Sequence, residues 1–307
     1  MTLDNPPKFT AGELNVYRNP ADVTAVTRAL RATGRRVALV PTMGALHEGH
    51  MSLVRASKAQ CGVTAVSVFV NPLQFEPPED LDQYPRRLER DARMLDQTGV
   101  DLVFAPGVAE MYPSGAQTYV MVEELSTKLD GNSRPGHFRG VTTVVLKLFE
   151  IVRPDKAFFG QKDAAQVAVL RQMVRDLDMD VEMVVCPIVR ENDGLAMSSR
   201  NAYLNPEQRR QALVLHRSLM RVQSAADLGE FEAAQLISLA KQVIGEEPGV
   251  RLDYFAIVDP DTLDPIENIS RGALAAVAAF VGTTRLIDNV LLTAPKEGPR
   301  LQAPRSH

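Results

Sequence analysis

Two histidines stand three positions apart in the segment PTMGALHEGH, which covers residues 41–50. An apolar strand pattern leads into this segment, Gly44 interrupts the pattern, and a helix is predicted to begin near Gly49. A helix N-terminus presents unpaired backbone N–H groups and the positive end of the helix dipole, and both favour phosphate. On the first helical turn His47 and His50 would share a face, where both imidazoles could donate N–H bonds to phosphate oxygens. The segment therefore predicts a phosphate-binding loop.

This loop lacks the parts of two common nucleotide-binding motifs. Gly44 and Gly49 have the glycine spacing of a Walker A loop, but His50 stands at the lysine position and Met51 at the Ser or Thr position. The dinucleotide signature GxGxxG is absent from the sequence as well. A P-loop is therefore excluded, and a nicotinamide enzyme is disfavoured.

Two further interpretations of the histidine pair compete with phosphate binding. A zinc metalloprotease needs HExxH, whereas this sequence has HExH and its remaining histidines are His137, His216 and His307. An arbitrary HxxH pair would be expected to cap a helix or lie on the surface. The pair follows a buried strand and a glycine loop, at the sheet edge where open parallel sheets bind ligands, and this context favours a ligand site.

A second cluster lies in the segment FFGQKD, residues 158–163. It follows another predicted strand, so in a parallel sheet its turn lies at the same edge as the histidine loop. Lys162 could then bridge phosphates in place of the missing Walker lysine, while Asp163 caps the next helix and Gln166 points into the same crevice. A solvated Lys–Asp turn is the alternative.

The third cluster is AMSSRN, residues 196–201. Adjacent serines and an arginine are common in plain turns, but two hydroxyls and a guanidinium are also the donors that a phosphate clamp requires. We expect this segment to act as a lid that excludes water when it closes.

The elements that must position these clusters follow a repeated strand and helix pattern. Continuous apolar runs, typical of strands buried on both faces, occur at residues 37–40, 63–70, 102–105, 157–159 and 181–186. Helical patterns occur at residues 49–60, 86–98, 138–152 and 163–177. This alternation predicts an α/β fold with a doubly wound, Rossmann-like parallel sheet and right-handed crossovers.

The pattern changes beyond residue 188, so we place a domain boundary there: 1–188 for the nucleotide-binding domain and 189–292 for a smaller mixed α/β lid domain. In the second domain Asn205 can cap a helix that starts at Pro206 and ends near Gly229. Strands are predicted at 253–258, 273–281 and 285–292. Residues 1–20 resemble a loose arm, and 293–307 a disordered tail.

Composition limits the function classes. The 307 residues carry a net charge of -4, with 45% hydrophobic and 23% charged residues, as in ordinary globular proteins. A protein without a global positive field is not expected to bind nucleic acid. Two distant cysteines, no secretion signal and no apolar run that could cross a bilayer predict a cytoplasmic protein without a membrane partner.

The chain resembles the pantothenate synthetase family, also called the pantoate-β-alanine ligases, within the HxGH nucleotidyltransferase superfamily. HxGH alone indicates the superfamily, whereas the ordered set of segments over nearly the whole chain indicates this family. The matching segments are PTMGALHEGH at 41–50, SVFVNPLQF at 67–75, EDLDQYPR at 79–86, MYP at 111–113, RPGHFRGVTTVVLKL at 134–148, FFGQKDAAQ at 158–166, DGLAMSSRN at 193–201 and GTTRLIDN at 282–289.

The resemblance implies an AMP-forming acid–amine ligase whose substrates are pantoate, β-alanine and ATP, and it suggests a homodimer. Pantoate attacks the α-phosphate of ATP to give pantoyl adenylate and pyrophosphate, and the amine of β-alanine then displaces AMP. Nucleotidyl transfer to a phosphate ester, a nucleotide-binding sensor and a tRNA-dependent synthetase of the same superfamily are the alternatives. The net charge of -4 fits tRNA poorly, and a sensor would be expected to have a defective site.

The resemblance also implies site residues. His47, His50 and Lys162 are the implied catalytic residues; hydrogen bonding or cationic stabilisation by His50 is favoured over proton transfer, since a carboxylate nucleophile loses no proton. Gln74 and Gln166 are the implied pantoate- and β-alanine-binding residues, since they resemble the amides that bind pantoate in the family. The implied ATP contacts are Met43, Gly44, Ala45, Leu46, His47, Glu48, Gly49, His50, Gly160, Gln161, Lys162, Asp163, Val189, Met197, Ser198, Ser199 and Arg200.

Magnesium is expected with ATP, because Mg²⁺ binds phosphate oxygens and retains water while using few protein carboxylates. We take Asp91, on the predicted helix after Tyr84-Pro85-Arg86, as its candidate ligand; an exposed helical aspartate is the alternative. The sequence departs from the family pattern at Ala164 and Ala165, which affects the packing near Gln166.

Overall fold

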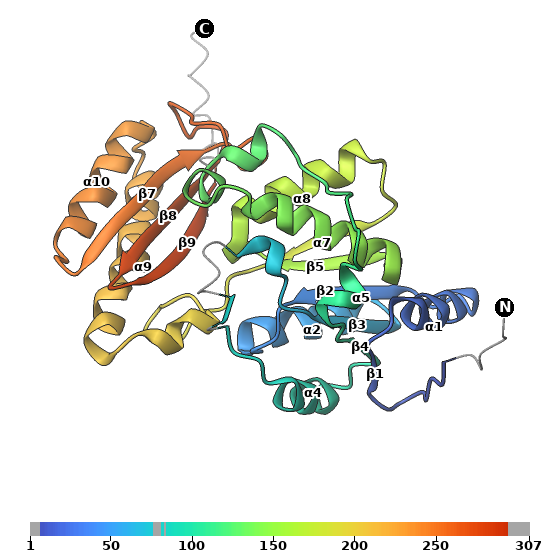
Figure 1. The fold of residues 1–307 in the computed structure, drawn as a ribbon. Coiled ribbons are helices and arrows are strands. Elements are labelled where there is room, and N and C mark those ends of the chain that lie inside the picture. The colour runs from blue at the N-terminus through green and yellow to red at the C-terminus, as the bar shows by residue number, and fades with distance from the viewer. Residues whose placement is uncertain (1–6, 76–80, 83, 294–307) are drawn as a thin grey trace, which may run out of the picture. The chain divides into compact units, whose positions relative to one another are not determined.

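The structure is a computed structural model that describes residues 7–75, 81, 82 and 84–293 (Figure 1). Its backbone contacts divide the chain into two compact units, residues 1–209 and 210–307, whereas the sequence places a domain boundary at 188. The tail predicted for 293–307 lies outside the described residues except for Thr293. Among the described residues, none of the helices has the length and apolar character that crossing a bilayer requires.

Within the described part of the first unit, six strands form one sheet in which every neighbouring pair is parallel. In spatial order they are β1 (Asn15–Tyr17), β4 (Leu102–Phe104), β3 (Val63–Val68), β2 (Val37–Thr42), β5 (Lys156–Gly160) and β6 (Glu182–Cys186). The central strands β2 and β3 are buried along most of their length, which explains their continuous apolar runs. The predicted doubly wound parallel sheet is confirmed.

Helices cover both faces of this sheet (Figure 1). On one face α2 (Glu48–Gln60) and α4 (Leu88–Gln97) contribute Val54 and Leu95 to a buried cluster that also contains Val40 and Val66 from the strands. On the other face lie α7 (His137–Val152) and α8 (Ala164–Asp176), and α1 (Pro20–Ala32) packs against α7. Full burial of each such Val or Leu contributes roughly 1.5–3 kcal/mol to folding.

The order of the strands places a crevice at the ends of β2 and β5. The chain runs from β2 outward through β3 and β4 and then returns to β5 on the opposite side of β2, which makes this the topological switch point. The two strands pair only at Ala38 with Lys156 and Leu39 with Ala157. Beyond these pairs β2 continues to pair with β3 and β5 with β6, and the loops that carry the histidine and lysine motifs begin after Thr42 and Gly160.

The described part of the second unit contains an antiparallel sheet of three strands, β7 (Val250–Val258), β8 (Ala273–Val281) and β9 (Thr284–Leu292). α10 (Ala233–Gly245) contacts β7. The predicted helix start is correct: Asn205 Oδ1 accepts a hydrogen bond from Gln208 N at 2.9 Å, and α9 spans Pro206–Asp227. The smaller mixed domain is therefore confirmed as part of the fold class.

The loose arm predicted for residues 1–20 is wrong at its end. Residues 15–17 form β1, Tyr17 is buried, and its hydroxyl donates to Lys8 O at 2.7 Å. Sequence periodicity cannot show a three-residue strand, because its stability comes from pairing with β4. Helices α1 and α10 were not predicted either. Further short helical elements among the described residues are α5 (Val108–Met111), α6 (Asp130–Ser133), η1 (Pro72–Gln74), η2 (Leu125–Thr127), η3 (Gln161–Asp163) and η4 (Ser199–Tyr203).

Candidate active site

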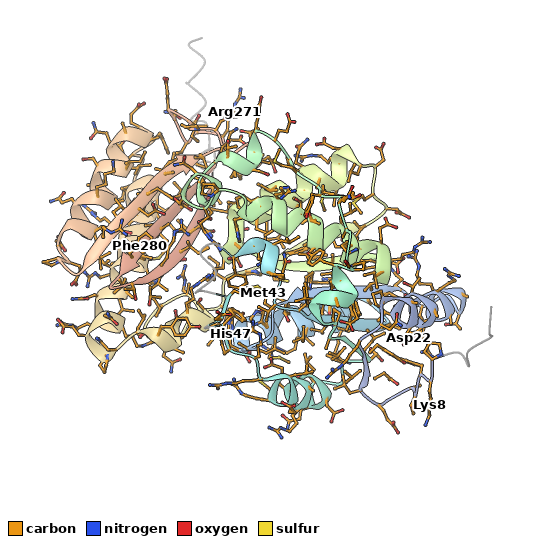
Figure 2. All side chains as sticks on the ribbon, in the orientation of Figure 1. Lys8, Asp22, Met43, His47, Arg271 and Phe280 are labelled. Atoms are coloured by element: carbon orange, nitrogen blue, oxygen red, sulfur yellow. The ribbon has the colours of Figure 1, made fainter. Side chains whose placement is uncertain are left out.

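A cavity of about 170 Å³ lies at the carboxyl ends of β2, β5 and β6, and every residue that lines it belongs to residues 41–200 of the first unit. It brings together residues that the sequence analysis drew from three separate motifs. Figure 2 shows Met43 and His47, from the segment after β2, close to one another. The lining includes these residues predicted for the site: Met43, His47, Gly49, His50, Gly160, Lys162, Asp163, Gln166, Val189, Met197, Ser198, Ser199 and Arg200.

The loop after β2 is built around a buried carboxylate. Asp91 on α4 is fully buried, and its two oxygens accept hydrogen bonds from Ala45 N at 2.8 Å and Leu46 N at 3.0 Å. Gly44 and Ala45 both have left-handed backbones, with φ of 85° and 51°. A side chain at Gly44 would place its Cβ 3.0 Å from Asp91 Oδ2 and 3.1 Å from Val68 Cγ1. The loop therefore needs glycine at this position and a carboxylate beneath it.

These contacts bear on the magnesium ligand expected at Asp91. Both carboxylate oxygens of Asp91 already accept hydrogen bonds from backbone amides, and the residue is fully buried. The described residues also contain no group of three or more His, Cys, Asp or Glu side chains that could hold a metal ion. The contacts favour a structural role for Asp91 in shaping the histidine loop.

The position of the protons on the histidines follows from their contacts. His47 is the N-cap residue of α2, and its backbone N–H donates to His50 Nδ1 at 3.4 Å. The proton of neutral His50 therefore resides on Nε2, which leaves that atom as the donor. The two rings lie 4.1 Å apart between centroids. The Nδ1 atom of His47 is buried and has no hydrogen-bond partner among the described residues.

Both histidines are held in the neutral form. Burial, together with the charge of the nearby Lys162, lowers the pKa of His47 to about 4. Burial lowers the pKa of His50 to about 3, with a second contribution from His47. Each imidazole therefore carries one N–H at neutral pH, and a phosphate group bound nearby would raise both pKa values. The arrangement suits hydrogen bonding to an anion.

Lys162 supplies the positive charge of the cavity beside the histidines. It lies in η3 directly after β5, its side chain is 20% exposed, and Nζ lies 3.4 Å from Asp163 Oδ1. Burial by itself would raise the pKa of Asp163, but the combined effect of Lys162, Arg200 and His50 outweighs burial and lowers that pKa. Asp163 occupies the predicted N-cap position of α8, although its side chain makes no capping hydrogen bond there and pairs with Lys162.

Gln74 is oriented by its neighbours. Asn71 Nδ2 donates to Gln74 Oε1 at 3.0 Å, so the amide nitrogen of Gln74 points the other way and donates to Met43 Sδ at 3.0 Å. Asn71 is itself buried and accepts a hydrogen bond from Tyr112 at 2.9 Å. Gln74 does not line the cavity, but it contacts Met43, which does. Gln166 lines the cavity directly.

The serine and arginine segment is held at its base by a network of ion pairs. Asn201 Nδ2 donates to Glu191 Oε1 at 2.8 Å, and Arg209 Nη2 donates to Glu191 at 2.8 Å and to Asp193 at 2.7 Å. Ser198 caps η4 by accepting from Arg200 N at 3.2 Å. These contacts place Ser198, Ser199 and Arg200 against the cavity; lid motion remains a prediction.

Several residues predicted for the site lie away from the cavity surface. Ala45 and Leu46 are buried in the core, and Glu48 is exposed and pairs with Arg55. Gly44, Gln161, Gln74 and Asp91 are also absent from the lining. Conversely, sequence reasoning missed six lining residues: Pro41, Leu53, Tyr84, Phe159, Pro187 and Ile188. Tyr84 could have been found, because it lies in a segment that carries the family resemblance and its hydroxyl donates to Gly44 O at 3.4 Å.

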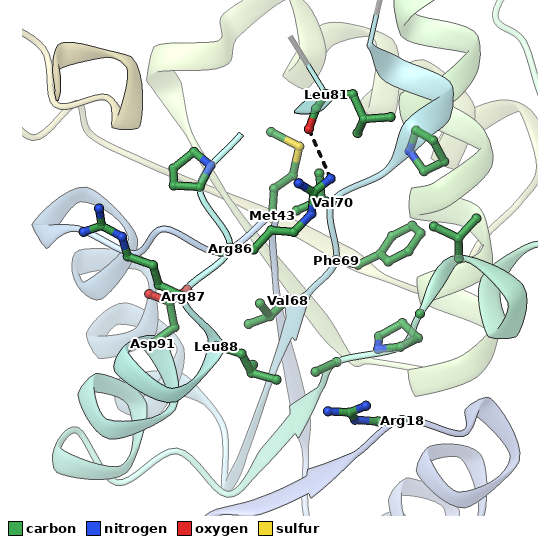
Figure 3. Close-up of a pocket in the computed structure, with 17 residues that line it drawn as sticks. Arg18, Met43, Val68, Phe69, Val70, Leu81, Arg86, Arg87, Leu88 and Asp91 are labelled. Atoms are coloured by element: carbon green, nitrogen blue, oxygen red, sulfur yellow. Dashed lines mark hydrogen bonds between the residues drawn. The ribbon is translucent and has the colours of Figure 1, made fainter. Parts of the chain in front are cut away.

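A second cavity, of about 330 Å³, shares Met43 with the first and is mostly apolar (Figure 3). Val68, Phe69 and Leu88 form part of its wall. The dashed line in Figure 3 marks the hydrogen bond from Arg86 to Leu81 O, which is 3.1 Å long. The histidine loop thus has open space beside Met43 and Gly44, and the contacts from Asp91 provide its support.

Comparisons with known proteins agree on one family. A family model described as pantoate-beta-alanine ligase matches residues 15–291. A pantothenate synthetase from Koribacter versatilis is 60% identical over 289 residues, which cover 94% of this chain and 99% of the relative. A pantothenate synthetase from Mycolicibacterium smegmatis is 55% identical over 293 residues, covering 95% and 92%.

Solved structures of the same family share the fold. The crystal structure of pantothenate synthetase from Thermus thermophilus has a TM-score of 0.86 and 46% identity, and the match covers 91% of this chain and 99% of that one. The pantoate-beta-alanine ligase from Francisella tularensis, complexed with beta-gamma ATP and beta-alanine, has a TM-score of 0.75 and 33% identity, covering 91% and 97%.

Proposed function

This chain belongs to the pantoate-β-alanine ligase family, and from that premise we propose that the cavity at the ends of β2 and β5 is its active site. The chain is an ATP-dependent ligase that joins pantoate and β-alanine through a pantoyl adenylate. The observation that carries the assignment of the site is the convergence of His47, His50 and Lys162 on one cavity at the topological switch point.

In the first step a carboxylate oxygen of pantoate forms a bond to the α-phosphorus of ATP, and the bond from that phosphorus to pyrophosphate breaks. The nucleophile is already ionised, so no base is required. Nε2–H of His50 and the ammonium group of Lys162 stabilise the negative charge that spreads over the phosphate oxygens. Ser198, Ser199 and Arg200, which also line the cavity, add further donors.

In the second step the unprotonated amine nitrogen of β-alanine attacks the acyl carbon, AMP leaves with the electron pair of the broken C–O bond, and the nitrogen loses a proton to solvent. Adenylation makes this possible, because AMP is a far better leaving group than oxide. Holding both reactants in one closed cavity supplies much of the acceleration, since two substrates meet in a fixed geometry. The serine and arginine segment excludes water, which would otherwise hydrolyse the adenylate.

Gln74 and Gln166 bind pantoate in this proposal. Asn71 directs the amide nitrogen of Gln74 toward Met43, which lines the cavity, and this nitrogen is the donor that we assign to pantoate. Amides satisfy hydroxyl and carboxylate groups without burying a second charge. Pantoate therefore lies beside Met43, within reach of the α-phosphate.

Magnesium accompanies ATP in this proposal, bound through phosphate oxygens and water. The described residues form no cluster of three or more ligating side chains, so they do not fit a dedicated protein cage for the ion. No step above is assigned to the metal.

A homodimer and a cytoplasmic location complete the proposal. Large apolar side chains are exposed at Val108, Tyr119 and Met121 of the first unit, and burial in a dimer would remove them from water. Sedimentation equilibrium of the purified chain distinguishes a monomer from a dimer. The two cysteines are free thiols, as expected in a reducing compartment.

The activity is tested by product analysis. Purified protein should release AMP and pyrophosphate in full turnover only when ATP, Mg²⁺, pantoate and β-alanine are all present. Formation of ADP, or turnover that is indifferent to β-alanine, would contradict the ligase function. AMP that stays attached to the final product would support nucleotidyl transfer instead.

A further inference from the structure

The segment RPGHFRG, residues 134–140, supports the family resemblance, but the proposed function gives it no role. It begins just before α7 and continues through the first turn of that helix. Arg134 Nη2 donates to the backbone oxygen of Gln74 at 3.0 Å, and His137 Nδ1 lies 2.9 Å from the same oxygen. Arg134 Nη1 lies 3.2 Å from His137 Nε2. Two side chains of this segment thus converge on one carbonyl group.

The chemistry of these atoms fixes the tautomer of His137. A guanidinium group only donates and a carbonyl oxygen only accepts, so Nε2 must accept from Arg134 and Nδ1–H must donate to Gln74. Burial, together with the charge of Arg134, lowers the pKa of His137 to about 3, so the ring stays neutral in its working pH range. A protonated ring could not accept the bond from Arg134.

The same segment also packs directly against the backbone of η1. A Cβ atom on Gly140 would lie 2.2 Å from Leu73 O and 2.7 Å from Gln74 N, so α7 and η1 are in direct backbone contact there. Asn71 Nδ2 donates to Gly140 O at 3.0 Å. The backbone on both sides of Gln74 is therefore fixed by α7, and its side chain is fixed by Asn71 and Met43.

We infer that Arg134 and neutral His137 are positioning residues for Gln74, and that they hold its amide at the distance from Met43 which pantoate binding requires. The inference rests on the proposed function, because it assumes that Gln74 binds pantoate. Neither side chain lines the active-site cavity. Their effect on the reaction therefore passes through Gln74.

Steady-state kinetics with each substrate varied in turn tests this role. His137→Ala removes the donor to Gln74 O and should raise KM for pantoate about tenfold, the effect of losing one hydrogen bond of about 1.4 kcal/mol. KM for ATP and for β-alanine should stay within about twofold. His137→Asn should recover most of the pantoate affinity, because its amide N–H can occupy the place of Nδ1–H.

Glu150→Gln, an exposed position on the same helix, is the matched control and should leave all three KM values unchanged. A rise in KM for β-alanine alone would overturn the inference, because the pair would then contact that substrate. Loss of kcat with unchanged KM for pantoate would overturn it as well. A wild-type protein without ligase activity would instead contradict the proposed function.

The tautomer gives a second readout that needs no turnover. The chain has five histidines, so ¹⁵N spectra of histidine-labelled protein can be assigned with single His→Asn variants. His137 should appear as the neutral Nδ1–H form from pH 6 to 8, and Arg134→Gln should alter the signal of its Nε2 atom. An Nε2–H tautomer or a titration within that range would overturn the inference.

Discussion

The chemistry of single residues in this site depends on where each proton lies. The backbone N–H of His47 donates a hydrogen bond to Nδ1 of His50, so the atom of the His50 ring that can donate is Nε2–H. Both rings are neutral in the free protein because burial lowers their pKa values to about 4 and about 3. Lys162 therefore supplies fixed positive charge, and the imidazoles supply directed hydrogen bonds. This division of labour favours charge stabilisation over proton donation in the adenylation step.

Removing either kind of donor should slow adenylation with little effect on the fold. His50→Ala or Lys162→Ala should reduce the rate by on the order of 10²–10³, as expected when a group that stabilises transition-state charge is lost. Single-turnover release of pyrophosphate with ATP and pantoate measures this step. Lys58→Gln, on the same helix as His50, is the control. A wild-type rate in a folded variant would show that its residue has no such role.

The sequence could predict these residues but not their partners. His47, His50 and Lys162 are recognisable from motifs, because the ends of parallel strands meet at one edge. The contact between His137 and Gln74 joins positions 63 residues apart, and the contact between Asp91 and Ala45 joins positions 46 apart. No local pattern encodes such pairs. For the same reason the sequence offered a magnesium ligand, or alternatively an exposed helical carboxylate, at Asp91, and it did not indicate that this side chain is fully buried.

At the level of elements, α4 supports the histidine loop through the hydrogen bonds that Asp91 accepts. Its Asp91 receives two backbone amides from a loop with two consecutive left-handed residues, a conformation that needs such external support. The conformation of the loop therefore depends on the position of α4. Strand and helix boundaries were predictable within a few residues where periodicity was long, whereas β1, α1 and α10 were missed. The three residues of β1 are held by tertiary pairing, which no sequence window shows.

Asp91→Ala tests the support of the loop. It leaves two buried N–H groups without a partner, at a cost of roughly 1–3 kcal/mol each, so the free energy of unfolding should fall by about 2–6 kcal/mol. KM for ATP should rise in protein that remains folded, while the Mg²⁺ concentration at half-maximal rate should not change. Glu89→Gln on the exposed face of α4 is the control. A selective loss of Mg²⁺ dependence would restore the metal-ligand role for Asp91.

In the first unit as a whole, the burial of histidines that builds the site lowers the free energy of unfolding at acid pH. Its parallel sheet brings His47 and His50 into the switch-point crevice, and α7 buries His137 beside it. Folding thus takes three imidazoles out of water and lowers all three pKa values. In the unfolded chain these groups titrate near the ordinary pKa of about 6.5. The stability of the unit is therefore coupled to pH through residues of the site and of its support.

The sign of this coupling follows from proton counts. Between pH 6.5 and about 4 the unfolded chain binds protons that the folded unit does not, so the free energy of unfolding falls as pH falls through this window. Each histidine contributes a slope that approaches about 1.4 kcal/mol per pH unit below pH 6.5. Denaturant titrations monitored by circular dichroism between pH 5 and 7.5 measure the slope.

His137→Asn removes one of the three groups and should make the slope shallower than in the wild-type protein, whereas Glu150→Gln, which changes no histidine, should not. An identical slope in His137→Asn would mean that His137 is not held neutral by folding, and the hydrogen bond from Arg134 to its Nε2 atom would then have no basis.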